Sequence, residues 1–135
     1  MFSLNSSDAP TSESTLPSGV PPMEQEFSRA RDLRESGDLE SSCGLLTRTF
    51  KERKRVLGLD DDHTQVAASQ LGRTLRAMGD FEGAIRLHRG VLEFRTLHYG
   101  HAHSFTLNSA QILADTYLQA GEPERARELK SLDPG

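Results

Sequence analysis

The amino-acid sequence predicts an all-α protein built as an α-solenoid, a row of antiparallel helix pairs with about two and a half units. Three observations predict it. A pattern repeats every 42 residues, apolar residues recur within each unit at helical spacing, and Gly-Asp or Gly-Glu pairs separate the helical stretches. Because no helix pair can bury its apolar stripe alone, neighbouring units are expected to stack.

Length and composition limit what the chain can do. Its 135 residues suffice for one small domain, and the formal net charge of −4 gives no overall basic field for nucleic acid. No apolar run approaches the ~18 residues of a membrane helix. The lone cysteine, Cys43, cannot form an internal disulfide, so we expect a reducing, cytoplasmic location, with Cys43 buried and inert.

The N-terminal stretch is rich in Ser, Thr and Pro and lacks the basic and apolar regions of a secretory signal. We expect a disordered tail over 1–22, a helical domain over 23–132 and a short tail over 133–135. Within the domain, the units are expected over 23–57, 62–99 and 104–132.

The repeat is visible without gaps. The segments "SGDLE", "MGDFE" and "AGEPE" begin at Ser36, Met78 and Ala120, in steps of 42. Aligning 37–78 with 79–120 gives ten identities, whereas chance gives roughly two or three at typical residue usage. The identities are Gly37, Asp38, Glu40, Leu45, Arg53, Gly58, Thr64, Ala68, Leu71 and Thr74 with their counterparts.

Each unit is expected to hold two helices joined by a tight turn. In the middle unit one apolar stripe runs from Ala68 to Met78 and a second from Phe81 to Phe94, both at helical spacing. Between them, Gly79 can take a positive φ and end the first helix, and the aspartate that follows can cap the second. The second helix of the third unit, from Pro123 to about 132, is short.

Each of the two later units has a small residue in its first helix, Gly72 or Ala114, then Leu75 or Tyr117, and a small residue in its second helix, Ala84 or Ala126. Together with the Gly-Asp or Gly-Glu turn, this pattern resembles the tetratricopeptide repeat, in the 42-residue variant familiar from kinesin light chains and from bacterial regulators of actinobacterial type. The resemblance covers about 24–130. The first unit departs from the family pattern at Ser42, where Ala is usual, and at Arg29, where Leu is usual, so we interpret it as a degenerate end unit.

The resemblance implies an interaction module that is not an enzyme and that needs no cofactor. Ligand-facing positions of the family lie along the first helices, and four arginines on one concave face could clamp an acidic segment or a C-terminal carboxylate. Alternatively, these arginines pair with Glu35 or Asp38. Carried onto this chain, the candidate peptide-binding residues are Phe27, Arg31, Arg34, Ser69, Arg73, Arg76, Gln111, Asp115 and Leu118.

A cluster of three histidines, His98, His101 and His103, raises the question of a metal site. His103 falls on the loop histidine of the family, so it is expected to bond loop backbone near a helix start. We favour a structural loop over adventitious metal binding, because a zinc site needs three or four preformed ligands. In the preceding loop, Asp62 is expected to cap the next helix.

Two functional hypotheses follow. In the first, the chain binds a protein or peptide partner through its arginine-bearing groove, without nucleic acid or membrane. In the second, it is a regulatory accessory or a fragment of a larger signalling ATPase or transcriptional regulator that carries such repeats. With only about two and a half units, it is expected to form a homodimer through exposed terminal helices or to lean on another protein.

Overall fold

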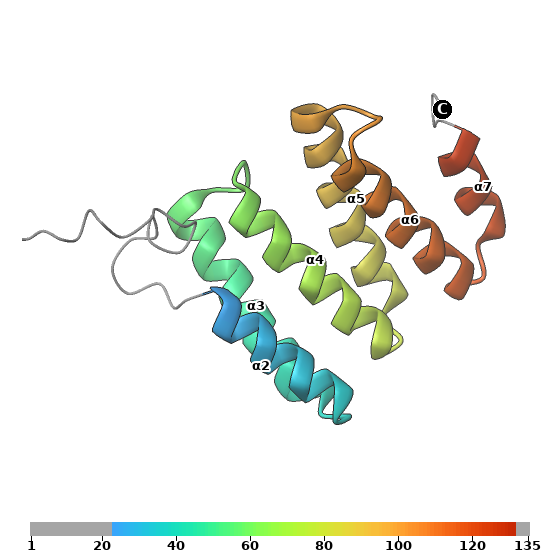
Figure 1. The fold of residues 1–135 in the computed structure, drawn as a ribbon. Helices are drawn as coiled ribbons and strands as arrows, with labels where there is room; N and C mark the ends of the chain where they lie inside the picture. Colours follow the sequence, from blue (N-terminus) through green and yellow to red (C-terminus); the bar gives the residue numbers. More distant parts are fainter. Residues whose placement is uncertain (1–22, 132–135) are drawn as a thin grey trace, which may run out of the picture.

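The computed structural model describes residues 23–131, and over them the chain is entirely helix and connecting turns, which confirms the all-α solenoid (Figure 1). The expected tails at 1–22 and 133–135 lie outside the described residues. The helices are α2 (Met23–Glu35), α3 (Leu39–Leu57), α4 (Asp62–Ala77), α5 (Phe81–Tyr99), α6 (Ser104–Gln119) and α7 (Pro123–Ser131).

The six described helices follow one another across the molecule in chain order, and each packs against the next (Figure 1). The first helices of the pairs, α2, α4 and α6, form one layer, and their partners α3, α5 and α7 form the other. Antiparallel pairs with short connections produce this arrangement because each helix must bury its apolar stripe against both neighbours. None of these helices combines the length and apolarity needed to cross a membrane.

The tight turns inside the pairs have the expected chemistry. Gly79 lies at a φ of 87°, and its backbone N–H donates to the Arg76 carbonyl at 3.0 Å, which closes α4. Asp80 then caps α5, since its carboxylate accepts the backbone N–H of Gly83 at 3.0 Å. The same glycine conformation recurs in the turns of the first and third pairs.

Small side chains allow the helices of a pair to approach closely. Ala30 and Ala114 in the first helices, and Ala84 and Ala126 in the second, are at most 4% exposed. Ser42, where the first unit departs from alanine, is fully buried, and its hydroxyl donates to the Ala30 carbonyl at 2.8 Å. The serine therefore lowers the stability of the fold little, because its buried hydroxyl is hydrogen-bonded to the partner helix.

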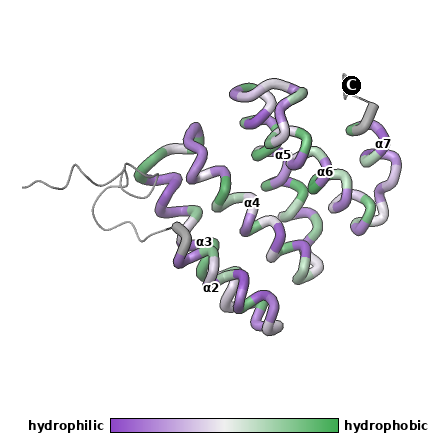
Figure 2. The backbone as a smooth tube through the Cα atoms, in the orientation of Figure 1, coloured by the Kyte–Doolittle hydropathy of each residue, from purple (hydrophilic) through white to green (hydrophobic). Residues whose placement is uncertain are grey.

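Apolar character is concentrated in the middle of the row. The tube of Figure 2 is mostly hydrophilic along α2 and α7 and more apolar along α5 and α6. Two clusters form the core, one around Leu46 and Leu71 and one around Leu113 and Tyr117. Cys43 lies at the edge of the first cluster and is half-buried, not buried as expected. Dimerisation through the terminal helices stays a prediction.

Candidate functional site

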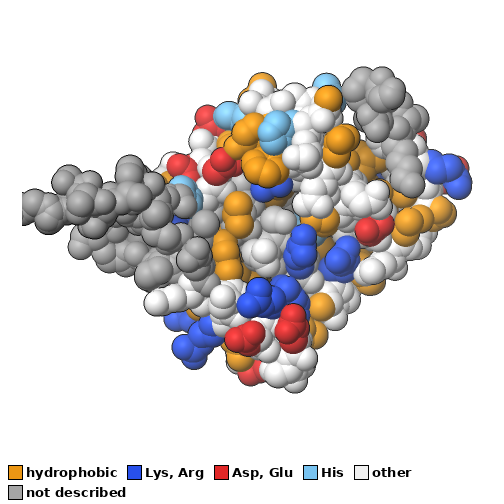
Figure 3. Space-filling model, in the orientation of Figure 1, with side chains coloured by type: hydrophobic (Ala, Val, Ile, Leu, Met, Phe, Trp, Pro, Cys, Tyr) orange, Lys and Arg blue, Asp and Glu red, His pale blue; other side chains and the backbone are white. Residues whose placement is uncertain are grey.

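The candidate site lies on the face formed by α2, α4 and α6. Figure 3 views the molecule from the direction of Figure 1, and Lys and Arg side chains gather there toward the lower ends of α2 and α4, with Asp and Glu side chains directly below them. These ends are the C-terminal turns, which carry Arg34 in α2 and Arg76 in α4. Cations complement the partial negative charge at a helix C-terminus, so arginines are favoured at both positions.

Three arginines converge on one pocket at this end of the layer. Arg34, Arg73 and Arg76 line it together with Ala77 and Gln119, and its volume is about 320 Å³. Because Gln119 belongs to α6, the pocket spans all three first helices. Its lining contains no acidic side chain.

Two of the arginines are held by equivalent hydrogen bonds, which lie one repeat apart. Arg34 donates from Nη1 to Thr74 Oγ1 at 3.4 Å, and Arg76 donates from Nη1 to Thr116 Oγ1 at 3.4 Å. Both threonines are fully buried, and each donates its own proton to the carbonyl four residues earlier, at 3.3 and 2.8 Å. The same contact therefore recurs after 42 residues, and each of these two guanidinium groups is oriented by a threonine of the following unit.

Replacing Thr116 by valine should remove the acceptor that holds Arg76. We expect the free energy of unfolding to fall by about 1–2 kcal/mol, because the substitution removes the hydrogen bond from Arg76 and also the one that Thr116 donates to the Ile112 carbonyl. Thr96→Val is the matched control, because the hydroxyl of that half-buried threonine makes no hydrogen bond to the described residues. Urea denaturation of both variants checks the prediction, and an equal loss in both would contradict it.

Arg73 lines the same pocket and experiences the charge of the two fastened arginines. Partial burial lowers the pKa of its guanidinium, and repulsion from Arg34 and Arg76 lowers it further. Its Nε atom is enclosed and has no hydrogen-bond partner among residues 23–131. Over the same residues, none of the three arginines forms an ion pair with a carboxylate, so the alternative pairing with Glu35 or Asp38 is not formed.

A buried histidine of α5 lies behind these arginines. His88 is 2% exposed, and its ring packs against Gly72 of α4, where a Cβ atom would stand 2.7 Å from the ring Cε1. Burial lowers its pKa to about 4, and the charges of Arg76 and Arg73 contribute. His88 is therefore neutral at pH 7 and adds no charge to the arginine cluster.

The remaining predicted residues lie outside the pocket lining. Arg31 is exposed, and Ser69 is half-buried. Gln111 donates from Nε2 to Asp115 Oδ1 at 2.9 Å, so the two side chains partly satisfy each other. Leu118 is 52% exposed. Phe27 is half-buried and packs against the core cluster around Leu46, and its contact with a ligand stays a prediction.

Sequence reasoning missed two kinds of residue. Ala77 and Gln119 line the pocket at the ends of their helices, one residue beyond the positions that the family pattern marks. The two anchoring threonines, Thr74 and Thr116, stand out in the sequence only as an identity between repeats. A signal was available, because a threonine retained at a fixed spacing from the arginines predicts a shared hydrogen bond.

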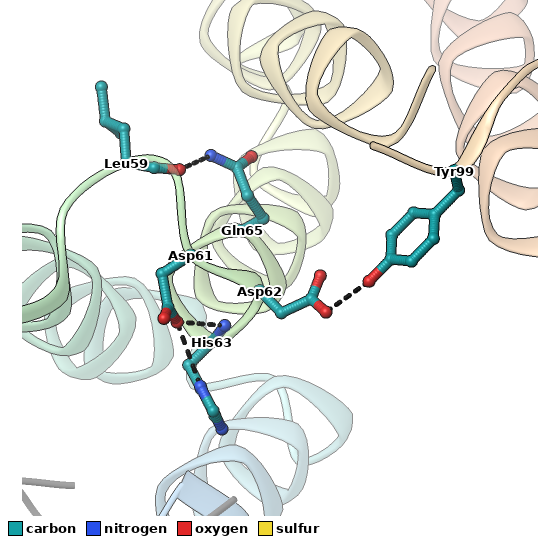
Figure 4. A network of polar contacts seen from close by, with 6 residues as sticks. All are labelled: Leu59, Asp61, Asp62, His63, Gln65 and Tyr99. Carbon is teal, nitrogen blue, oxygen red and sulfur yellow. Dashed lines mark hydrogen bonds and ion pairs between the residues drawn. The ribbon is translucent and has the colours of Figure 1, made fainter. Parts of the chain in front are cut away.

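The inter-unit loop before α4 is organised differently from the prediction. Asp61, not Asp62, caps the helix, because Asp61 has extended backbone and its carboxylate accepts the His63 N–H at 2.8 Å (Figure 4). Asp62 is already helical and accepts the hydroxyl of Tyr99, which reaches across from the end of α5. This hydrogen bond raises the pKa of Tyr99.

The three histidines of the second loop have separate environments. His103 caps α6 by accepting the backbone N–H of Phe105 at its Nδ1, 3.0 Å away, as expected for a structural loop. His98 lies with Nδ1 2.9 Å from the Phe94 carbonyl and Nε2 3.2 Å from a carboxylate oxygen of Asp60. His101 is exposed. Within 23–131, no three His, Cys, Asp or Glu side chains are grouped to hold a metal ion.

Comparisons with known proteins agree with this architecture. The sequence profile of the family described as Tetratricopeptide repeat matches residues 63–130, half of the chain. No curated protein matches. A Podosopora anserina protein assigned as a kinesin light chain, with nearly identical TPR-like repeats, superposes with a TM-score of 0.76 at 23% identity, over 86% of this chain and 56% of that chain.

Two further solved structures are similar. A point variant of the same Podosopora anserina protein gives a TM-score of 0.75 at 21% identity, over 79% of this chain and 50% of that one. The TPR domain of Arabidopsis FLU gives 0.66 at 16% identity, over 82% and 89% of the two chains. At these identities the likeness shows the fold alone. The chain spans about half the length of the two Podosopora chains.

The matched residues 63–130 span helices α4 to α7, which are stacked helix pairs. The kinesin-light-chain-like structures share the same stacking of helix pairs. Repeats of this kind are non-catalytic scaffolds that mediate protein–protein interaction. The chain belongs to the tetratricopeptide repeat (TPR) family.

Proposed function

We propose that the helical domain over 23–132 binds a protein or peptide partner in the groove of α2, α4 and α6, and that the partner carries an acidic segment or a C-terminal carboxylate. The supporting observation is the arginine pocket. Its three guanidinium groups have no carboxylate partner among the described residues. Guanidinium groups bind carboxylates bidentately, so an acidic partner would supply the missing counter-charge.

The groove is prepared for such a partner before binding. Arg34 and Arg76 are held by buried threonines, so less side-chain entropy is lost when a ligand binds. On α6 the position equivalent to these arginines is Leu118, which is exposed and uncharged. The positive charge is therefore concentrated over α2 and α4, and the acidic part of the partner would lie there.

The test compares capture of partners from the lysate of the source cell by three immobilised proteins. One is the wild type, one carries Arg73→Glu and Arg76→Glu, and one carries Arg86→Glu and Arg89→Glu. The last is a matched control, because Arg86 and Arg89 are exposed on α5 and the change in net charge is the same. Circular dichroism confirms the helical content of each protein.

We expect a partner that binds the wild type and the α5 control and is lost from the groove variant. A synthetic tetraglutamate peptide serves as a defined probe, and its binding should follow the same order and weaken with added salt. Equal capture by the groove variant and the α5 control would refute binding through the arginine groove.

A further inference from the structure

We infer that the pocket of Arg34, Arg73 and Arg76 receives a phosphate monoester dianion, carried by a phosphorylated side chain of the partner. This inference rests on the proposed function and specifies the anion that the groove selects. The observation behind it is a count of charges. Three guanidinium groups converge on a lining that contains no carboxylate, so a carboxylate would neutralise one positive charge and a phosphate monoester up to two.

The donors of the pocket suit a tetrahedral anion. A guanidinium carries five N–H donors, and one nitrogen of Arg34 and one of Arg76 are occupied by threonine hydroxyls. Arg34 lines the pocket from α2, Arg73 and Arg76 line it from α4, and Gln119, whose side chain ends in an amide, lines it from α6. A phosphate monoester presents three acceptor oxygens that can be bound from several sides, whereas a carboxylate presents two in one plane.

The electrostatics of the pocket favour the ligand with more charge. The pKa of Arg73 is lowered by partial burial and also by repulsion from Arg34 and Arg76, the two other cations that line the pocket. A dianion relieves this repulsion more completely than a monoanion does. His88 behind the pocket is neutral near pH 7, so it neither adds to the positive charge nor competes for the ligand.

The experiment uses the full chain, labelled with ¹⁵N, and follows arginine Nε–Hε and backbone signals by NMR. Three probes are titrated at pH 7.5: acetyl-Gly-Gly-phosphoserine-Gly-Gly-amide, the same peptide with glutamate in place of phosphoserine, and the same peptide with serine. Inorganic phosphate is titrated separately. Arg73→Gln is the test variant, because Arg73 makes no hydrogen bond that its loss would break, and Arg86→Gln on α5 is the matched control.

We expect the phosphoserine peptide to bind at least tenfold more tightly than the glutamate peptide, and the serine peptide to cause no shift. The preference should vanish in Arg73→Gln and persist in Arg86→Gln. It should also shrink at least threefold at pH 5.5, because a phosphate monoester has its second pKa near 6. The glutamate peptide stays ionised at that pH, and His88, with a pKa of about 4, stays neutral.

Each other outcome has a definite meaning. Equal binding of the glutamate and phosphoserine peptides overturns the phosphate inference and leaves the proposed function standing. A phosphate preference that survives in Arg73→Gln also overturns it, because the anion then binds elsewhere. Failure of both anionic peptides overturns the pocket as an anion site altogether. If inorganic phosphate binds as tightly as the phosphopeptide, the dianion chemistry holds and its source is the free ion instead of a partner protein.

Discussion

Replacing Gly72 by alanine is expected to lower the free energy of unfolding by about 2–3 kcal/mol, because there is no room for a methyl group. The new Cβ would lie 2.7 Å from Cε1 and 2.8 Å from Nε2 of His88. The ring cannot move aside easily, since His88 is 2% exposed and Gly72 is itself buried. Urea denaturation of the variant and of the wild type measures the loss.

The first unit shows which second substitution should relieve the clash that Gly72→Ala creates with the His88 ring, since it has a different pair of residues at the two equivalent positions. The positions equivalent to Gly72 and His88 are Ala30 and Leu46, which share one core cluster and are at most 1% exposed. The double variant Gly72→Ala/His88→Leu copies that pair, so it should regain most of the lost stability. A double variant no more stable than Gly72→Ala would show that the clash with the ring is not the cause.

Acid is expected to destabilise the fold through His88 by roughly 3 kcal/mol between pH 6.5 and pH 4. The folded-state pKa of about 4 lies below the ordinary value of 6.5, so the unfolded chain takes up a proton first as the pH falls. The stability is fully present above pH 6.5 and is lost progressively down to about pH 4. The physical cause is burial of the ring, reinforced by the charges of Arg76 and Arg73.

His88→Leu separates this contribution from the rest of the molecule. The variant keeps the other four histidines and all carboxylates, so the difference between its pH profile and that of the wild type isolates His88. We expect the wild type to lose more stability than the variant over this range, in chemical denaturation at half-unit steps of pH. Parallel profiles for the two proteins would mean that the buried ring titrates normally.

The fold could be predicted because its determinants are local and repeated. Gly79 and Asp80 encode a helix end and a helix start within two residues, and the 42-residue period places the same turn in each pair. The choice between Asp61 and Asp62 as the cap was beyond sequence reasoning, since either carboxylate can accept a helix N–H. The structure decides it through Tyr99, whose hydroxyl engages Asp62 from a segment 37 residues away.

The candidate site could be predicted only in part, for a different reason. Helical spacing puts Arg31, Arg34, Arg73 and Arg76 on one face, but it does not say where long side chains end. Arg34 and Arg76 are drawn to the pocket by threonines of the next unit, while Arg31 stays exposed outside it. The role of His88 was also hidden, because its burial against Gly72 depends on packing between helices.

The hydrogen bonds from Arg34 to Thr74 and from Arg76 to Thr116 each join one repeat to the following one. A row of stacked helix pairs can bend as a whole, and bending changes the distances between equivalent points of successive units. Since each of these arginines belongs to one unit and is tethered to the next, flexing must either stretch the tether or carry the guanidinium group with it. The spacing of positive charge in the pocket is therefore tied to the curvature of the array.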